Sequence, residues 1–387
     1  MSAALEAQAA GASVILITKS ALGASNTSRA QGGIQAAMGD GDSTQSHYAD
    51  TLAAGHDAGQ PELVRTLTDS GPEAIAWLAQ IGVPFTRDGD TLRILRCGGA
   101  SRPRLLQSGE RTGAEMVKAL RASVRVSGVE VIESAALRSL EPRAADNWRA
   151  LVATAAGDLE IDPRAIVLAA GGGLGGEAKR IGIGSTNHPD ATPEVLELAI
   201  ALGAETVHLD SWQYHPTGSV WPEPLAGYAL PETTRSYGAT LHDVNNERFV
   251  DELAPRDVVA GAITTVVEDG RGVSAPNGVV GAWLDTPAID RTNGEGFTAA
   301  RLSYVHNRYL KAGIDITRER VIVHPVLHYR NGGIVIDRDA TTSLPGIFAA
   351  GEITGGVHGT NRLMGNSLLD TIVFGRRAGA SAARWAA

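Results

Sequence analysis

Two short apolar segments of this chain run directly into glycines, and they limit the possible folds more than any other feature. Residues 165–170 (AIVLAA) precede three glycines, and residues 346–350 (GIFAA) precede Gly351 and Glu352. Such runs are typical of buried strands in a parallel sheet, and open α/β sheets bind ligands at the carboxyl ends of their strands. Two such ends could face one ligand, although two independent strand–helix turns would show the same pattern.

The N-terminal residues indicate half of a dinucleotide-binding unit. Residues 3–10 predict a helix closed by Gly11, and residues 13–18 (SVILIT) predict a buried parallel strand. A complete unit starts with an earlier strand and a Gly-x-Gly-x-x-Gly turn, which receives the pyrophosphate at a helix N-terminus. Because the sequence starts inside that helix, we expect the natural start to lie further upstream. An ordinary helix–strand pair is the alternative.

Composition excludes several classes of protein. The chain has 387 residues, of which 43% are hydrophobic, so two domains are the default expectation. A net charge of -9 without a basic run disfavours nucleic acid as a partner. A single cysteine, Cys97, excludes an intrachain disulfide and a Cys-rich metal site, and it favours the cytoplasm. We predict no metal site and no signal or membrane segment, because the N-terminal apolar run is short and lacks a basic flank.

Residues 212–323 differ in character from the rest of the chain. They hold a proline-rich loop (WPEPLAGYALPE), scattered histidines and arginines, and a helical stretch around residues 255–268. We interpret them as a capping domain inserted between two parts of a nucleotide-binding domain, residues 1–211 and 324–387. The interface between two such domains is a preferred place for a small-molecule site.

Five segments resemble, in order, those of the flavoprotein family of succinate dehydrogenase, fumarate reductase and L-aspartate oxidase. They are TKSALGASNTSRAQGGIQAA, QYHPTG, NERFVDELAPRDVVAGAI, HYRNGGIVID and AAGEITGGVHGTNRLMGNSLLD. The resemblance implies an α/β fold with a Rossmann-like FAD-binding domain in two sequence segments and an inserted α+β capping domain. It also implies hydride transfer between flavin N5 and a C4 dicarboxylate of the fumarate/succinate type.

The resemblance implies roles for five side chains in that reaction. Arg362 would bind one substrate carboxylate, and His215 and His328 would bind the other. Arg256 would deliver the proton, with Glu232 as its relay. An arginine suits the first task because its planar fork makes two hydrogen bonds to a carboxylate, and it suits the last only if a neighbouring carboxylate restores its proton. Taken from the residues alone, each could be an ordinary core or surface side chain.

The resemblance also implies how FAD is held. A helix that begins at Asn366 would direct its N–H groups at the flavin N1/O2 edge, where negative charge accumulates on reduction. Membrane-bound members carry a histidine bonded to FAD where this chain has Asn26, so we expect FAD to bind without a covalent bond. The implied cofactor-binding residues are Lys19, Ser20, Ser25, Asn26, Thr27, Gln31, Gly32, Gly33, Gly171, Glu194, Glu352, Asn366, Ser367 and Leu368.

The chain departs from the family pattern at three positions. Glu194 stands in ATPEV where the family has Thr-Gly-Asp-Gly, and Pro231 replaces a threonine that contacts substrate. Cys97 replaces the glutamate with which aspartate oxidases contact the substrate amino group. We therefore expect an FAD-dependent dicarboxylate oxidoreductase, with an iron–sulfur protein as a possible electron partner. L-aspartate oxidase or a related amino-acid oxidase is the first alternative, and a flavin-free remnant acting as a binding protein is the second.

Overall fold

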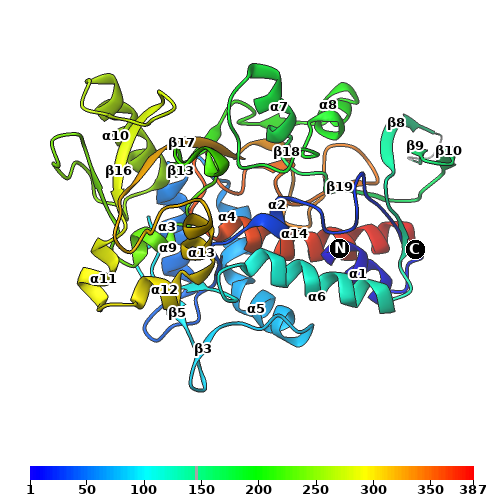
Figure 1. The fold of residues 1–387 in the computed structure, drawn as a ribbon. Coiled ribbons are helices and arrows are strands. Elements are labelled where there is room, and N and C mark those ends of the chain that lie inside the picture. Colours follow the sequence, from blue (N-terminus) through cyan, green and yellow to red (C-terminus); the bar gives the residue numbers. More distant parts are fainter. Residues whose placement is uncertain (144–146) are drawn as a thin grey trace.

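Helix α14 (Asn366–Ala386) forms the centre of the computed structural model, which describes residues 1–143 and 147–387. It begins directly after Gly365, whose φ of +85° is a left-handed conformation that glycine adopts without strain. Most of its apolar side chains are buried, although Trp385 near its end is 47% exposed, and the helix packs closely on α1 (Ser2–Ala9). A Cβ at Gly379 would lie 2.2 Å from the carbonyl oxygen of Ala3, so only glycine permits this approach. The two helices lie side by side in Figure 1.

Two separate pairs of parallel strands lie near this helix. Strand β11 (Ile166–Leu168) pairs with β19 (Ile347–Ala349), which confirms that the two segments ending in glycines are strands and shows in addition that they are neighbours. Strand β1 (Ile15–Ile17) pairs with β7 (Glu130–Ile132). The prediction that β1 is buried was wrong, because Ile15 is 42% exposed. Within the described ranges β1 pairs only with β7, and the residues of β1 line a cavity.

Helices and short sheets complete this first core. Helix α6 (Thr112–Val126) packs on α1 and α2 (Asn26–Arg29), and helices α4 (Pro61–Asp69) and α5 (Gly71–Gln80) pack on α14. The other helices are α3 (Thr44–Ala54), α7 (Leu174–Ile181) and α8 (Glu194–Ala201). Three small sheets have the strand orders β2 (Ile34–Gln35)–β6 (Leu105–Leu106)–β5 (Ile94–Leu95), β10 (Gly157–Ile161)–β9 (Trp148–Thr154)–β8 (Ala136–Pro142) and β12 (Thr206–Val207)–β18 (Gly333–Val335)–β20 (Thr354–Gly355). Strands β3 (Arg87–Asp88) and β4 (Thr91–Leu92) form a hairpin.

A second hydrophobic core forms the left-hand lobe of Figure 1, and its residues lie between Leu225 and Val323. Its sheet has the antiparallel order β13 (Trp212–Ser219), β17 (Val321–Arg330), β16 (Val280–Asp285), β14 (Thr240–His242), with β15 (Val273–Ser274) also on β16. The helical elements here are η2 (Glu223–Leu225), α9 (Thr233–Ser236), α10 (Arg256–Glu268), α11 (Ala288–Asn293), α12 (Phe297–Arg301) and α13 (Ser303–Lys311).

The strand pair β13–β17 belongs to both parts of the molecule. Val321 and Val323 at the start of β17 are members of the second core, whereas Arg330 at its end donates hydrogen bonds to carbonyl groups of residues 172 and 209 in the first part. Side chains along this pair therefore lie where the two parts meet. Within the described chain, no helix is both long enough and apolar enough to span a bilayer.

Candidate active site

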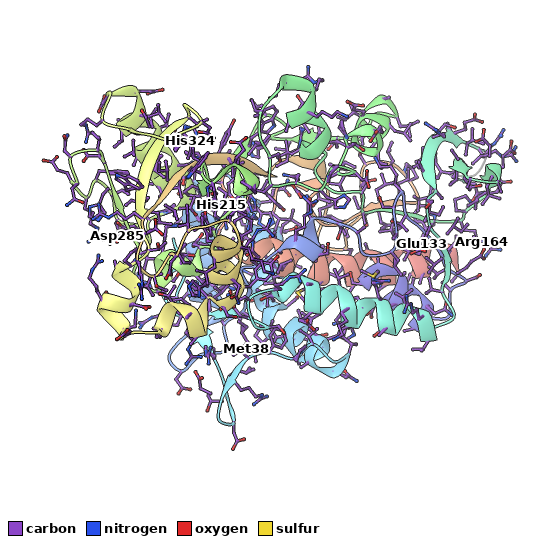
Figure 2. All side chains as sticks on the ribbon, in the orientation of Figure 1. Met38, Glu133, Arg164, His215, Asp285 and His324 are labelled. Carbon is purple, nitrogen blue, oxygen red and sulfur yellow. The ribbon has the colours of Figure 1, made fainter. Side chains whose placement is uncertain are left out.

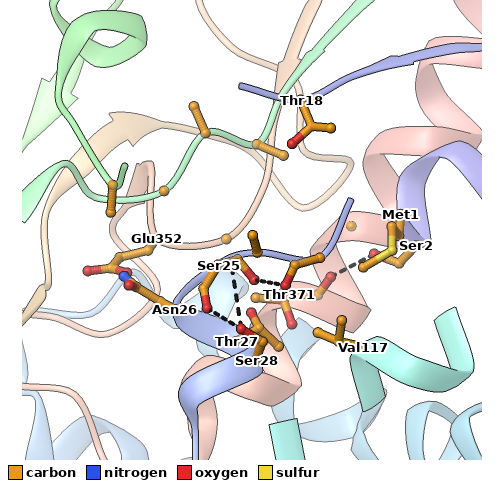
Figure 3. Close-up of a pocket in the computed structure, with 18 of the residues that line it drawn as sticks. Met1, Ser2, Thr18, Ser25, Asn26, Thr27, Ser28, Val117, Glu352 and Thr371 are labelled. Atoms are coloured by element: carbon orange, nitrogen blue, oxygen red, sulfur yellow. Dashed lines mark hydrogen bonds between the residues drawn. The ribbon is translucent and has the colours of Figure 1, made fainter. Parts of the chain in front are cut away.

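A cavity of about 2330 Å³ lies between the two parts of the molecule. Its wall includes β1, the loop and helix that follow it, the ends of β11 and β19, and the start of α14. The second core contributes Tyr304 and Arg308 of α13. Ligand pockets commonly measure about 300–1,000 Å³, so this cavity has room for a large cofactor together with a small substrate. Figure 3 shows one part of the cavity, where Asn26 and Glu352 approach each other.

The structure brings nearly all of the predicted site residues to this one cavity. Asn366 is the exception, because its side chain lies between His47 and Thr51 of α3 and is absent from the cavity wall. Gly365 and Ser367 on either side of it do line the cavity. The predicted residues that line it are Lys19, Ser20, Ser25, Asn26, Thr27, Gln31, Gly32, Gly33, Gly171, His215, Glu232, Glu194, Arg256, His328, Glu352, Arg362, Ser367 and Leu368.

The segment after β1 presents backbone to the cavity. Ser25 precedes the short helix α2 as its N-cap, and the side chains of Ser25 and Ser28 form a capping box. At Gly33 a Cβ would lie 2.5 Å from the carbonyl oxygen of Leu106 in β6, so a larger residue would displace the strand. At Gly32 a Cβ would meet the end of the flexible Met364 side chain at 2.9 Å. Part of the cavity wall is therefore bare main chain, to which a flat ring system can lie close.

Asn26 links three segments beside the cavity. Its Nδ2 donates to Asn187 Oδ1 at 2.6 Å and to Glu352 Oε2 at 3.3 Å, and its Oδ1 accepts from the N–H of His188 at 2.7 Å. Burial raises the pKa of Glu352, whose Oε1 accepts from the N–H of Arg330 at 3.1 Å. The carboxamide of Asn26 is thus held in a network of hydrogen bonds at the end of β19.

Lys19 and Ser20 lie at a more exposed end of the cavity. Lys19 Nζ is 3.6 Å from Glu194 Oε2 and donates a hydrogen bond to Thr192 Oγ1, while Ser20 Oγ donates to Asp190 Oδ2. The segment of residues 190–194 therefore contacts the segment after β1 through polar side chains. This part of the cavity is open to solvent and is lined by both positively and negatively charged side chains.

A buried charged cluster lines another part of the cavity. Glu232 Oε2 lies 3.0 Å from Arg256 Nε and 3.3 Å from Arg235 Nη2, and Glu232 Oε1 accepts from the N–H of Gly98 at 2.7 Å. Burial by itself would raise the pKa of Glu232, but Arg235 and Arg256 hold that pKa below its usual value. Glu232 is therefore an ionised carboxylate in contact with two guanidinium groups.

Arg362 adds a further positive charge to this cluster. Its guanidinium lies 4.3 Å from the centre of the Tyr329 ring, and its Nη2 donates to Gln213 Oε1 at 2.9 Å. Burial lowers the pKa of Arg362 to about 10, so the side chain remains protonated at neutral pH. Its Nε has no partner among the described residues. The cluster holds three arginines against one ionised carboxylate, and an anionic ligand would offset the surplus charge.

His215 and His328 stand on the neighbouring strands β13 and β17, with ring centroids 5.2 Å apart. Figure 2 shows His215 between the left-hand lobe and the centre of the molecule. Burial lowers the pKa of both imidazoles well below the usual value, so both are neutral. The N–H of Thr217 donates to His215 Nδ1 at 3.3 Å, which assigns the proton of that ring to Nε2. His215 therefore offers the cavity a neutral hydrogen-bond donor.

Sequence reasoning missed three residues of the site. Gln213 accepts hydrogen bonds from Arg256 and Arg362, Tyr329 lies under the guanidinium of Arg362, and Gly98 donates its N–H to Glu232. Gln213 and Tyr329 lie in the QYHPTG and HYRNGG segments, whose histidines were singled out, so position within those segments was the available signal. Gly98 directly follows Cys97, which was also singled out, so its position gave the same signal. Among residues 1–143 and 147–387, no group of three or more His, Cys, Asp or Glu side chains could hold a metal ion.

Parallel strands that end in glycine turns beside a cavity are typical of α/β proteins that bind a nucleotide cofactor, and the buried arginines in its wall suit an anionic ligand. The profile of the FAD binding domain family matches residues 1–368. The chain belongs to this family of FAD-binding oxidoreductases, which confirms the family, the fold class and the cofactor expected from the sequence.

Known proteins similar to the chain include fumarate reductases and L-aspartate oxidases. It is 36% identical to one of the subunits of the fumarate reductase (CoM/CoB) of Methanothermobacter marburgensis, over 92% of this chain and 65% of that protein. It is 34% identical to the L-aspartate oxidase of Streptomyces coelicolor over 99% of this chain and 66% of that protein. Thus the chain spans slightly less than two thirds of either relative.

Solved structures with a similar fold include a fumarate reductase chain and a second protein, Sdh1. The FrdA chain of an E. coli quinol fumarate reductase variant has a TM-score of 0.89 and 28% identity, covering 100% of this chain and 68% of FrdA. Mycobacterium smegmatis Sdh1 has a TM-score of 0.80 and 33% identity, covering 100% of this chain and 66% of Sdh1. Both parts of the fold, including the second core, therefore have counterparts in these flavoproteins.

Proposed function

We propose that this chain interconverts a C4 dicarboxylate pair of the fumarate/succinate type, as an FAD-dependent oxidoreductase. The observation that carries the proposal is a surplus of buried positive charge beside the cavity, where Arg235 and Arg256 contact one ionised carboxylate, Glu232, and Arg362 shares the amide oxygen of Gln213 with Arg256. Buried like charges are costly unless a ligand compensates them, and a dianion matches a surplus of two charges. The names of the similar fumarate reductases agree with this substrate class.

Three side chains would hold the two carboxylates of such a substrate. Arg362 lies in the cavity wall with a free Nε and a planar guanidinium oriented by Tyr329, which suits bidentate binding of one carboxylate. The neutral His215 and His328 would donate hydrogen bonds to the other carboxylate from the adjacent strands. Groups that fix both ends of a short dicarboxylate also fix its central carbon–carbon bond.

Arg256 is the residue we assign to proton transfer at that bond. It lines the cavity, and its Nε donates to Glu232 at 3.0 Å. An arginine that gives up a proton must recover one, and the ionised Glu232 in contact with both Arg256 and Arg235 is placed to pass it on. The positive charges of the cluster would also polarise the double bond of an unsaturated dicarboxylate.

FAD would occupy the remainder of the cavity. The bare main chain at Gly32 and Gly33, the polar groups around Asn26 and Glu352, and the start of α14 fit a flat ring system with polar edges. When bound, the flavin supplies hydride transfer at N5. We propose that it is held without a covalent bond, because the carboxamide of Asn26 is not a nucleophile and is engaged in hydrogen bonds.

We propose that residues 212–323 act as a capping domain over a cofactor domain formed by residues 1–211 and 324–387. The second hydrophobic core, whose residues lie between Leu225 and Val323, supports this division. A separate electron-transfer protein with an iron–sulfur centre would exchange electrons with the flavin. The single cysteine of the chain fits a cytoplasmic setting.

L-Aspartate is the second candidate substrate, because several similar proteins are L-aspartate oxidases. An α-ammonium group needs an acceptor close to the central carbons. Glu232 already accepts from Arg256 and Gly98, and burial raises the pKa of the Cys97 thiol, so Cys97 is neutral there. The cluster therefore favours a dicarboxylate without an amino group.

The test is a comparison of substrates with the purified chain after incubation with FAD. We expect reduction of fumarate by a reduced viologen dye, or oxidation of succinate by an artificial acceptor, at a higher kcat/KM than oxidation of L-aspartate. A preference for L-aspartate would replace the proposal with the oxidase function. Failure to bind FAD at all would indicate a flavin-free binding protein instead.

A further inference from the structure

Gln213 makes four hydrogen bonds at the point where Arg256 and Arg362 come together. Its Oε1 accepts from Arg256 Nη1 at 3.2 Å and from Arg362 Nη2 at 2.9 Å. Its Nε2 donates to Asn361 Oδ1 at 2.7 Å and to the carbonyl oxygen of Arg362 at 2.8 Å. A carboxamide has two donor and two acceptor positions, so this side chain, which is only 3% exposed, is fully satisfied.

Neighbouring groups decide which end of the Gln213 amide faces the arginines. Asn361 uses its Nδ2 to donate to the carbonyl oxygen of Ala54 at 2.9 Å and to Asp257 Oδ1 at 2.8 Å, so its Oδ1 must face Gln213. A reversed Gln213 amide would place N–H groups against two guanidinium groups and its oxygen against two acceptors. The amide oxygen is therefore directed at the arginines by a chain of contacts that ends at Asp257, the residue after Arg256.

We propose that Gln213 is a positioning residue that sets the spacing between Arg256 and Arg362. Two guanidinium groups repel each other, yet here both donate to one oxygen atom, which holds them in a single arrangement. Gln213 is not part of the cavity wall, so it acts through the arginines and not by contact with a ligand. The inference rests on the proposed function, in which Arg362 binds one carboxylate while Arg256 must lie beside a particular carbon.

The spacing matters because both tasks are performed on one rigid, short substrate. Proton transfer needs the donor within about 3 Å of the accepting atom, and a displacement of about 1 Å can cost roughly 100-fold in rate. If the shared oxygen is removed, each guanidinium loses a charge-assisted hydrogen bond and the two are free to separate. Carboxylate binding and proton delivery should then weaken together.

The experiment compares Gln213→Leu and Gln213→Asn with native protein and with Tyr214→Phe, a control at a more exposed position on the same strand. We expect Gln213→Leu to raise KM and to lower kcat, each by roughly 10- to 100-fold, because each arginine loses one charge-assisted hydrogen bond. Gln213→Asn keeps the amide but moves it away from the two arginines by about 1.5 Å, the length of one carbon–carbon bond. Its KM and kcat should therefore resemble those of Gln213→Leu. Tyr214→Phe should behave as native.

A double-mutant cycle separates positioning from general damage. In the background of Arg256→Ala, the further effect of Gln213→Leu on kcat should shrink, because one of the two groups that Gln213 spaces is already gone. Fully additive effects on kcat and KM would contradict the inference. So would values within about threefold of native in a folded Gln213→Leu protein that binds FAD normally. If that variant does not fold, Gln213→Asn is judged by the same criteria.

Turnover of dicarboxylates by the native protein tests the proposed function separately. If it turns over no dicarboxylate, the proposed function is wrong, and the spacing is then tested by the rise in melting temperature that succinate produces. That rise should be smaller in Gln213→Leu than in Tyr214→Phe, because a displaced Arg362 binds a carboxylate less tightly. An equal rise in the two variants would overturn the role of Gln213.

Discussion

Replacement of Arg256 by alanine tests the assigned chemistry most directly. Proton transfer by a positioned side chain commonly contributes about 10²- to 10⁴-fold, so we expect kcat for fumarate or succinate to fall by that factor. KM should change by less than about tenfold, because Arg362, His215 and His328 remain to hold the carboxylates. FAD content should not change, since the predicted cofactor residues lie elsewhere in the cavity.

The same substitution has a calculable effect on stability. Glu232 would lose one guanidinium but keep Arg235 at 3.3 Å and the N–H of Gly98 at 2.7 Å. Breaking a buried ion pair typically costs about 3–5 kcal/mol because one charge is left uncompensated, and since Arg235 still compensates Glu232 here, the expected loss of unfolding free energy is below about 3 kcal/mol.

The assay is steady-state turnover with an artificial electron donor, together with urea unfolding followed by circular dichroism. Arg318→Ala is the matched control, because it removes an arginine whose side chain is 84% exposed and which lies outside the cavity wall. Turnover of Arg256→Ala within about threefold of native would refute proton delivery by this residue, provided that the native protein is active. A loss confined to stability would identify Arg256 as a structural partner of Glu232.

Three further changes should give results of different kinds. Arg362→Lys should raise KM for a dicarboxylate by roughly 10- to 100-fold while the charge is kept, because a point charge cannot reproduce the planar fork, and an unchanged KM would remove Arg362 from the binding site. Acid precipitation of the FAD-loaded protein should leave the flavin in solution, and yellow colour in the washed pellet would contradict non-covalent binding. Burial lowers the pKa of His47 to about 4 in the folded protein, whereas in the unfolded chain the pKa of this imidazole is near 6.5. The stability that the buried neutral ring contributes is therefore fully present above pH 6.5 and is lost as the pH falls towards 4. The decrease in unfolding free energy between pH 7 and pH 5 should therefore be about 2 kcal/mol smaller in His47→Gln than in native protein, and equal decreases would show that His47 is not the titrating group.

Local patterns in the sequence were enough to predict the elements that carry the site. The strands before the glycine turns and the helical stretch around residues 255–268 lie where their residues indicated, and the helix that the resemblance implied does begin at Asn366. Each depends on neighbours in sequence: apolar runs, turn residues and helix ends. The resemblance to known flavoproteins then supplied the side chains that the structure brings to one cavity.

Contacts between distant segments could not be predicted in the same way. Gln213 faces Arg256, Arg362 and Asn361, and nothing local to any of these residues indicates the other three. Periodicity shows that a side chain is buried, but it does not show which segment lies opposite. The exposure of β1 was missed for a related reason, since an apolar strand is buried only where other elements cover it.

The strand pair β13–β17 has a consequence for engineering by recombination. Because β17 begins in the second core and ends in contact with the first part of the molecule, and because the pair carries His215 and His328, the lobe at the left of Figure 1 is not a separable unit. A chimera that took only the residues of the second core from one relative and the remainder from another would have to cut through β17, the strand that carries His328. Exchange points placed in the loops before β13 and after β17 would instead transfer both strands together, so that the pairing register between them is preserved.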